Sequence, residues 1–255
     1  MFKNLRQYQF LFEELVKRDF KKKYKRTILG MGWSMLMPLL MLLVMNVVFG
    51  QFFGRSIEHF TTYLFCGNLL FCWFSESTNL GMRSLYANAG IFTKVNIPKY
   101  LFLFAGCVQT FINFILTLLV FFFFCWLDDI DFTWKFFLLV YPVLTMLAFN
   151  IGIGLVLSAL FIFFRDVDYL WGVFLQLLMY GSAIFYKIDG FSSDMQIVFS
   201  FNPVYRHIAY FREVVLTGAV PSLATHLTLL GFAVVSVILG MFMYKRYNTR
   251  FLYYV

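Results

Sequence analysis

Long apolar stretches separated by short polar segments set the pattern of this chain. The first stretch runs from Ile28 to Gly50 without a formal charge, and it exceeds the roughly 20 residues that an α-helix needs to cross the hydrocarbon core of a bilayer. Comparable stretches predict six transmembrane helices, at residues 29–53, 62–85, 100–127, 135–164, 169–186 and 223–244. We therefore expect an all-α polytopic membrane protein in which residues 1–255 form a single transmembrane domain.

The distribution of positive charge supports this topology. Only 13% of the residues are charged, compared with about 25% in soluble domains. Six spans would leave both termini in the cytoplasm, with sixteen of the 21 lysines and arginines inside and five outside. This asymmetry follows the positive-inside rule. The rule also accounts for the net charge of +8 without a nucleic-acid partner.

A basic amphipathic helix is expected before the first span, at residues 4–26. Its apolar positions are Leu5, Tyr8, Phe12, Leu15 and Phe20, and its charged positions are Arg6, Glu13, Lys17 and Lys21. Because each set recurs close to helical spacing, the helix can lie in the plane of the lipid head groups. Two interpretations remain open, a membrane-surface anchor and a docking surface for a cytoplasmic partner.

The second predicted span carries polar residues along one face. They follow steps of three and four residues: Asn68, Cys72, Ser75, Glu76, Asn79 and Arg83. Glu76 would lie well inside the membrane, where an ionisable side chain normally faces the interior of a bundle or a water-filled cavity. The stripe is therefore either a hydrogen-bonded seam between helices or the wall of a translocation path.

Two segments between the spans have distinct patterns. Residues 86–99 form a polar break containing Asn, Gly and Pro, long enough for one short helix, and Lys94 and Lys99 mark it as cytoplasmic. Residues 187–221 are too polar to span a membrane and too apolar to form a solvated loop. They predict two short amphipathic helices in a re-entrant or interfacial hairpin at the outer surface, whose turn needs cover from protein or water.

The expected hairpin has recognisable helix boundaries. Its first helix would run from Ser193 to about Phe201, Asn202 and Pro203 would break it, and the second helix would end at Thr217–Gly218. One face of the second helix would carry Val204, Ile208, Phe211 and Val215, and the other face would carry Arg206, Tyr210 and Glu213.

Motifs for nucleotide hydrolysis and metal binding are missing from the sequence. There is no phosphate-binding loop of the form GxxxxGK(S/T), so the chain is not expected to hydrolyse ATP itself. The histidines lack HExxH spacing and the four cysteines form no CxxC pair, so no metal site is expected. Glu76 could act as a general acid, but no second catalytic group accompanies it, and no catalytic residue is assigned.

Four segments together resemble one known family. The segment RDFKKKYKRTILGMGWSMLMP is similar to the start of the ABC-2 type permeases that export bacterial polysaccharides such as O-antigen, capsule and teichoic acid. Its matching residues are Arg18, Asp19, Tyr24, Thr27, Gly30, Trp33 and Pro38. FSESTNLGMRSLYANAGIFTKVNIPK, FFRDVDYLWGVFLQLLMYGSAIFY and NPVYRHIAYFREVVLTG resemble later parts of the family in the same order. The resemblance covers the chain from about residue 15 to residue 220.

This resemblance implies a homodimer of six-span subunits that joins two separate ATP-binding subunits. ATP and Mg would be bound by those subunits and no cofactor by this chain. The substrate would be a glycan on a polyprenyl diphosphate carrier. The N-terminal helix and the loop at residues 86–99 would contact the ATP-binding subunit, the loop through Asn88, Ile91, Phe92 and Lys94. Residues 187–221 would form the outer gate, through Asn202, Pro203, Arg206, Tyr210 and Glu213.

The resemblance and the polar stripe together predict an exporter in a bacterial cytoplasmic membrane. We expect its path to be lined by Asn68, Ser75, Glu76, Asn79, Gln176 and Tyr180. Arg83, Lys94 and Lys99 would receive the diphosphate, because cations near the inner head groups suit its charge. The alternatives are an ABC-2 exporter of a drug or small lipid and a membrane-embedded enzyme acting on lipid-linked sugars.

Overall fold

The computed structural model describes residues 8–25, 27–54, 57–95, 97–248, 250–252 and 254. The expected start of the N-terminal helix at residues 4–7, and its last residue Arg26, lie outside these. Helices account for all the regular structure of the described residues. Their bounds are α2 Gln9–Tyr24, α3 Gly32–Phe53, α4 Phe60–Ala87, α5 Ala89–Phe92, α6 Tyr100–Leu127, η1 Trp134–Leu139, α7 Val140–Phe163, α8 Val167–Gly181, α9 Ser193–Ser200, α10 Pro203–Leu216, α11 Leu223–Tyr247 and η2 Arg250–Leu252.

Four described segments are long and apolar enough to cross a membrane: α3, α6, η1 with α7, and α11. The two other expected spans do not meet both conditions. α4 has 28 residues, but the polar stripe lowers its hydropathy. α8 ends at Gly181 after 15 residues, and a helix of that length measures about 22 Å, less than the hydrocarbon thickness of about 30 Å.

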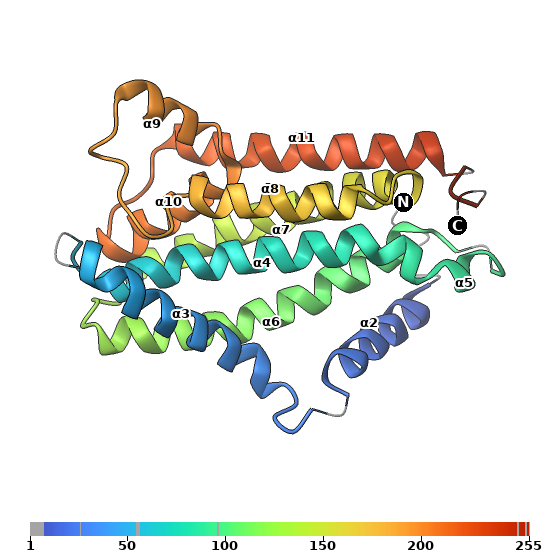
Figure 1. The fold of residues 1–255 in the computed structure, drawn as a ribbon, viewed down its shortest axis with the longest axis horizontal. Coiled ribbons are helices and arrows are strands. Elements are labelled where there is room, and N and C mark those ends of the chain that lie inside the picture. The colour runs from blue at the N-terminus through green and yellow to red at the C-terminus, as the bar shows by residue number, and fades with distance from the viewer. Residues whose placement is uncertain are drawn as a thin grey trace.

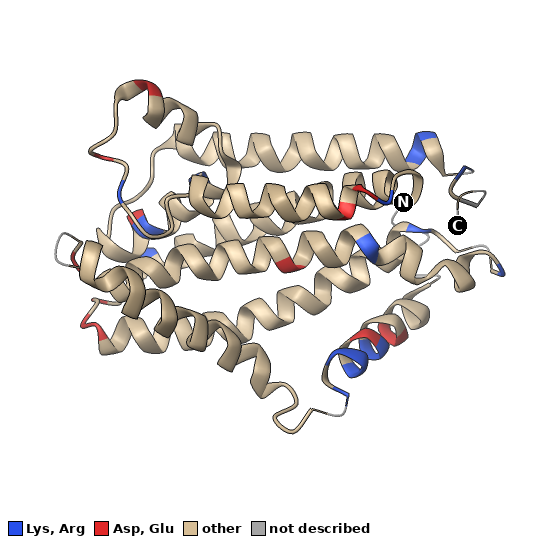
Figure 2. Cartoon of the chain, in the orientation of Figure 1, with Lys and Arg blue, Asp and Glu red and all other residues tan. Residues whose placement is uncertain are grey.

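Figure 1 shows α4, α6, α7, α8 and α11 running side by side, with α3 and α2 inclined along one flank. α5, α2 and the C-terminal end of α11 lie at one end of this bundle, here called the basic end. α9 and the C-terminal end of α10 lie at the other, here called the hairpin end. Charged residues gather at these two ends and on α2, while the middle of the bundle is almost free of charge (Figure 2).

Small residues bring the central helices into close contact. α4 packs against α6 and α7, and α7 packs along α11. At the α4–α7 crossing, a Cβ added at Gly81 would lie 3.1 Å from the Cα of Gly154. At the α7–α11 crossing, a Cβ added at Gly152 would lie 2.4 Å from the carbonyl carbon of Ser236. The backbones of α7 and α11 therefore touch, as is common where small residues line membrane helix interfaces.

This contact predicts that Gly152→Ala separates α7 from α11. The added methyl meets backbone atoms that cannot rotate away, and overpacking of this kind costs about 1–3 kcal/mol, or roughly 2–12 °C in unfolding temperature. Thermal unfolding of the purified protein in detergent measures the shift. Gly172→Ala on α8 is the matched control, because nothing lies within 4 Å of a Cβ there. Equal unfolding temperatures for the two variants would contradict the prediction.

The predicted second helix of the hairpin is α10, and its buried face is confirmed. Val204, Ile208, Phe211 and Val215 are all buried, against α4, α7 and α11. The expectation for Tyr210 was wrong, because this residue is fully buried as well. Its hydroxyl lies 2.9 Å from Nε2 of His226 on α11, so burial leaves no polar atom without a partner.

Two local signals explain where α10 begins and ends. The side chain of Asn202 accepts hydrogen bonds from the backbone N–H groups of Val204 (2.9 Å) and Tyr205 (3.2 Å) and so caps the helix. Pro203 occupies the first turn, where its missing N–H costs nothing. Gly218 takes a φ of +57° just after the last turn, a conformation that glycine adopts readily.

Candidate functional site

The polar stripe of α4 divides into an internal part and an open part. Asn68 is buried and accepts a hydrogen bond from the thiol of Cys72 at 3.3 Å. Asn79 donates to the backbone oxygen of Ser75 at 2.9 Å. Both contacts stay within α4, so they satisfy polar atoms without joining helices. Glu76 lies between them and reaches other helices.

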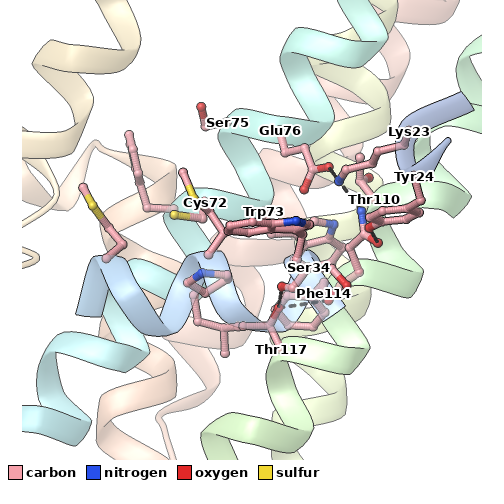
Figure 3. Close-up of a pocket in the computed structure, with 17 residues that line it drawn as sticks. Lys23, Tyr24, Ser34, Cys72, Trp73, Ser75, Glu76, Thr110, Phe114 and Thr117 are labelled. Atoms are coloured by element: carbon pink, nitrogen blue, oxygen red, sulfur yellow. Dashed lines mark hydrogen bonds and ion pairs between the residues drawn. The ribbon is translucent and has the colours of Figure 1, made fainter. Parts of the chain in front are cut away.

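Glu76 joins α4 to α2 and α6. Its carboxylate forms an ion pair with Lys23 near the end of α2, and Asn113 on α6 donates to it at 3.2 Å. The hydroxyl of Tyr24 donates to the side-chain oxygen of Asn113 at 2.8 Å. Figure 3 shows Lys23 and Glu76 pointing toward each other from α2 and α4. This arrangement, the Lys23–Glu76 latch, holds the end of α2 against the bundle.

Two cavities adjoin at the latch, and both are lined by Lys23 and Glu76. The apolar cavity has a volume of about 530 Å³ and lies between α2, α3, α4 and α6 (Figure 3). Its apolar lining includes Trp33, Met37, Met41, Leu69, Trp73 and Phe114. The cationic cavity has a volume of about 640 Å³ and lies between α2, α4 and α6. Its cations are Arg18, Lys22, Lys23 and Arg83.

Most cations of the cationic cavity already have partners. Arg18 contacts Asp19 at 2.6 Å and donates to the side-chain oxygen of Asn88 at 2.7 Å. Arg83 donates to both carboxylate oxygens of Asp168, at 2.8 and 3.0 Å. Lys22 has no carboxylate partner among the described residues. The cavity therefore offers one unneutralised cation and three that an incoming anion would share with carboxylates.

A buried arginine organises the hairpin end. Arg212 on α10 donates to the backbone oxygens of Ala183 (2.8 Å), Ile184 (2.9 Å) and Tyr63 (3.2 Å). Its guanidinium also lies 3.4 Å from the ring centroid of Tyr63, within cation–π range. No carboxylate takes part in these contacts, which join α10 to α4 and to the segment after α8. We call this set the carbonyl cage.

Two further observations show how closely the carbonyl cage is fitted. Ala183 has a φ of +48°, an uncommon backbone conformation for a residue with a Cβ. A Cβ added at Gly67 would lie 3.0 Å from a guanidinium nitrogen of Arg212, so glycine provides the space for the arginine. Asn202 adds a second tie, because its amide donates to the backbone oxygen of Gly181 at 2.8 Å.

Comparison with known proteins assigns the family. The family described as "ABC-2 type transporter" matches residues 11–216. The chain belongs to this family. It is therefore a multi-pass membrane protein of the permease type, and in such transporters ATP is used by a partner subunit.

Similarity to three curated permeases extends over almost the whole chain. The chain is 24% identical to the O-antigen export system permease protein RfbA of Klebsiella pneumoniae, over 95% of each chain. It is 26% identical to the protein of the same name from Myxococcus xanthus, over 93% of this chain and 91% of the relative. It is 22% identical to the polysialic acid transport protein KpsM of Escherichia coli, over 91% and 92% of the two chains.

In this ABC-2 chain, the residues expected to line a path fall into two groups. Ser75, Glu76 and Asn79 line the apolar or the cationic cavity. Asn68 is buried and lines neither. Gln176 and Tyr180 lie on the exposed face of α8 and line neither cavity. Within one subunit, the two groups are not brought together.

The three cations expected to receive a diphosphate also separate. Arg83 lines the cationic cavity. Lys94 is exposed just after α5. Lys99 donates to the backbone and side-chain oxygens of Asn248 beyond α11, at 2.9 and 3.0 Å. Arg18, Lys22 and Lys23 accompany Arg83, but none of the three was expected at the diphosphate, and Arg18 was named only as a match to the family. The available signal was the spacing of four residues between Arg18 and Lys22, which places both on one face of α2.

The expected coupling loop contains α5, which is anchored from within. Asn88 is buried and donates to the backbone oxygen of Ser84 at 2.7 Å. Phe92 is buried beside Leu101 and Phe102 in a cluster that also includes Leu15 of α2. Ile91 is partly buried, and Lys94 is exposed. Asn88 and Phe92 therefore fix the loop, while Lys94 is available at its surface.

The residues expected at the outer gate are mostly structural ties. Asn202 and Pro203 begin α10, and Arg206 donates to the backbone oxygen of Ser200 at 3.0 Å, which closes the α9–α10 turn. Glu213 lines a third cavity of about 360 Å³ at the hairpin end, together with Arg212. Arg212, which forms the carbonyl cage, was not among the expected gate residues, because its sequence pattern did not distinguish it from Arg206.

Proposed function

We propose that this chain is the membrane permease subunit of an ABC transporter that exports a polysaccharide linked to a polyprenyl diphosphate carrier across the bacterial cytoplasmic membrane. One observation carries the proposal: the match, over more than 90% of this chain, to relatives named for O-antigen export and polysialic acid transport. The mixed character of the site supports it, because such a substrate has a hydrocarbon part, an anionic part and a polar glycan.

The proposed topology has six spans, with both termini in the cytoplasm. α4 would be a span despite its polar stripe, because its 28 residues are long enough and its neighbours cover most of its apolar surface and part of the polar face. α8 would cross only part of the bilayer, and α9 and α10 would complete the crossing as a re-entrant hairpin. The burial of α10 against α4, α7 and α11 supports this arrangement, since non-helical backbone at membrane depth needs protein cover.

The proposed assembly is two copies of this chain with two ATP-binding subunits, which would hold ATP and Mg. α2 and the loop at residues 86–99 would receive the force from the ATP-binding subunits. Asn88 supports this role, because it accepts a hydrogen bond from Arg18 and so connects the loop to α2. A movement of the loop would then pass from Asn88 to Arg18 and along α2 to the Lys23–Glu76 latch.

The proposed translocation path runs between the two copies. Gln176 and Tyr180 lie on an exposed face of α8, which a second copy could complete. Ser75, Glu76 and Asn79 would form the part of the path next to the latch, and Asn68, whose buried amide nitrogen has no partner among the described residues, would lie toward its outer end. Arg83 would contribute to diphosphate binding, with Lys94 and Lys99 attracting the anion from nearer the membrane surface.

Affinity purification of the tagged chain from its native membrane tests the proposal. A co-purifying ATP-binding subunit in about equal amount is expected, because each copy would bind one such subunit. Mass spectrometry identifies the partner. Deletion of the gene should then leave the lipid-linked polysaccharide inside the cell, and the restored gene should return it to the surface. A partner subunit with unchanged surface polysaccharide would favour a drug or small lipid as cargo, and turnover of lipid-linked sugars by the chain alone would favour the enzyme alternative.

A further inference from the structure

The apolar and cationic cavities meet at charged residues that belong to both. Lys23 and Glu76 line each of them, so a molecule placed at the latch would have an apolar space on one side and a basic space on the other. We infer that the two cavities form one binding site for a lipid with a phosphate-containing head group, whose head lies in the cationic cavity and whose hydrocarbon chain enters the apolar cavity.

The apolar cavity suits a hydrocarbon chain. Trp33, Met37 and Met41 of α3 form one side, and Leu69, Trp73 and Phe114 of α4 and α6 form the other. The ring of Trp73 stacks on Phe114 with 4.0 Å between centroids, which gives the cavity a flat aromatic wall. Met37 is 64% exposed, so the cavity opens on the surface of α3, where lipid would surround the protein. A flexible apolar chain can therefore enter without unfolding any element.

The cationic cavity suits a phosphate or diphosphate. Arg18, Lys22, Lys23 and Arg83 approach it from α2 and α4. Lys22 lacks a carboxylate partner among the described residues, so it can bind an anion without first losing an ion pair. Lys and Arg donate charge-assisted hydrogen bonds to phosphate oxygens, which are stronger than neutral ones. A phosphate at this position would also compete with Glu76 for Lys23.

An unpartnered donor gives a second indication of a ligand. The indole Nε1 of Trp73 is buried and has no hydrogen-bond partner among the described residues, although buried donors are normally paired. Trp73 lines the apolar cavity below Glu76 in the view of Figure 3. A polar atom of a bound molecule near the latch could accept this hydrogen bond.

The proposed substrate carries one hydrocarbon chain and a diphosphate, and the two cavities offer an apolar space and a basic space for these parts. We therefore assign the site to an isoprenoid diphosphate. This assignment rests on the proposed function for the identity of the lipid, but the site itself can be tested without export. If the isoprenoid diphosphate binds but no polysaccharide is exported, the site is supported and the proposed function is contradicted. If polysaccharide is exported but the isoprenoid diphosphate does not bind, the proposed function is supported and the site is contradicted.

Photo-crosslinking tests the inference directly. The full-length permease, with any co-purifying subunit, is placed in phosphatidylcholine nanodiscs and labelled with a diazirine analogue of farnesyl diphosphate. Mass spectrometry should locate the label in residues 33–41, 69–76 or 110–117. Farnesyl diphosphate should displace the probe. Inorganic diphosphate, which lacks the hydrocarbon chain, and farnesol, which lacks the diphosphate, should each compete at least about tenfold more weakly.

Matched variants separate the two halves of the site. Met37→Trp should fill the mouth of the apolar cavity and lower labelling about tenfold. Because Met37 is exposed, the substitution should leave the fold intact. Leu40→Trp is the control, because Leu40 is exposed on the same helix and does not line the cavity. Lys22→Gln should weaken binding of farnesyl diphosphate severalfold, whereas Lys21→Gln should not, since Lys21 does not line the cationic cavity.

Three results would overturn the inference. The first is label spread over the lipid-facing surfaces of α7 and α11. The second is labelling that Met37→Trp leaves unchanged. The third is displacement of the probe by phosphatidylglycerol as effectively as by farnesyl diphosphate, which would assign the cavities to a membrane phospholipid and not to an isoprenoid diphosphate.

Discussion

Replacing Arg212 with methionine is expected to lower the unfolding temperature by roughly 10 °C. The substitution keeps most of the volume but removes all hydrogen bonds of the carbonyl cage, which join Arg212 to Ala183, Ile184 and Tyr63. Hydrogen bonds to charged groups contribute about 1.5–3 kcal/mol each, and carbonyls left unpaired in a buried place add to the loss. A net loss of about 3 kcal/mol corresponds to about 6–12 °C for a chain of this size. Thermal unfolding in detergent measures the shift.

Two further variants show whether the geometry of the arginine matters. Arg212→Lys should recover only part of the stability, because one ammonium group cannot reproduce the planar fork that reaches several carbonyls. Arg206→Met is the matched control, since Arg206 lies on the same helix and makes a single hydrogen bond to Ser200. If Arg206→Met lowered the unfolding temperature as much as Arg212→Met, the carbonyl cage would not be what holds the hairpin.

Replacing Glu76 with glutamine is expected to reduce polysaccharide export about tenfold while leaving the complex assembled. The change removes the charge that holds Lys23 but keeps the shape of the side chain, so α2 should detach more often from α4 and α6. A loss of about 1.4 kcal/mol is enough for a tenfold effect. Surface polysaccharide measures export, co-purification of the ATP-binding subunit measures assembly, and hydrogen exchange of α2 amides measures docking.

A charge exchange isolates the latch from other roles of Glu76. The double variant Lys23→Glu with Glu76→Lys should restore the docking of α2, because the ion pair can form in the opposite direction. Glu14→Gln is the matched control, since Glu14 pairs only with Lys17 on the exposed side of α2. Normal export by Glu76→Gln would remove Glu76 from the mechanism.

The sequence predicted the apolar helices well because their patterns are local. The third span was expected at residues 100–127 and is α6, Tyr100–Leu127. The first span was expected at 29–53 and is α3, Gly32–Phe53. The fifth was placed at 169–186, but α8 stops at Gly181. The backbone oxygen of Gly181 accepts a hydrogen bond from Asn202, and this tie joins positions too far apart along the chain for a local pattern to reveal.

The candidate site was only partly predictable for a similar reason. Spacing within α4 was sufficient to identify Glu76 and Arg83, because a helix places its stripe on one face. The partners of these residues come from other elements: Lys23 from α2, Asn113 from α6 and Asp168 from α8. Among several basic residues of α2, spacing alone did not distinguish Lys23, and among the arginines of the hairpin it did not distinguish Arg212.

The contact between α7 and α11 has a consequence for biosynthesis. α11 leaves the ribosome after α7, and until then the groove at Gly152 is uncovered and the hydroxyl of Ser158 on α7 bonds only the backbone oxygen of Leu155, at 3.1 Å. Ser158 completes its contact through the hydroxyl of Tyr244, at 2.7 Å. Only a chain that extends through α11 therefore covers this face of α7, and a nascent chain that terminates before residue 223 would present it to the proteases that clear incomplete membrane proteins.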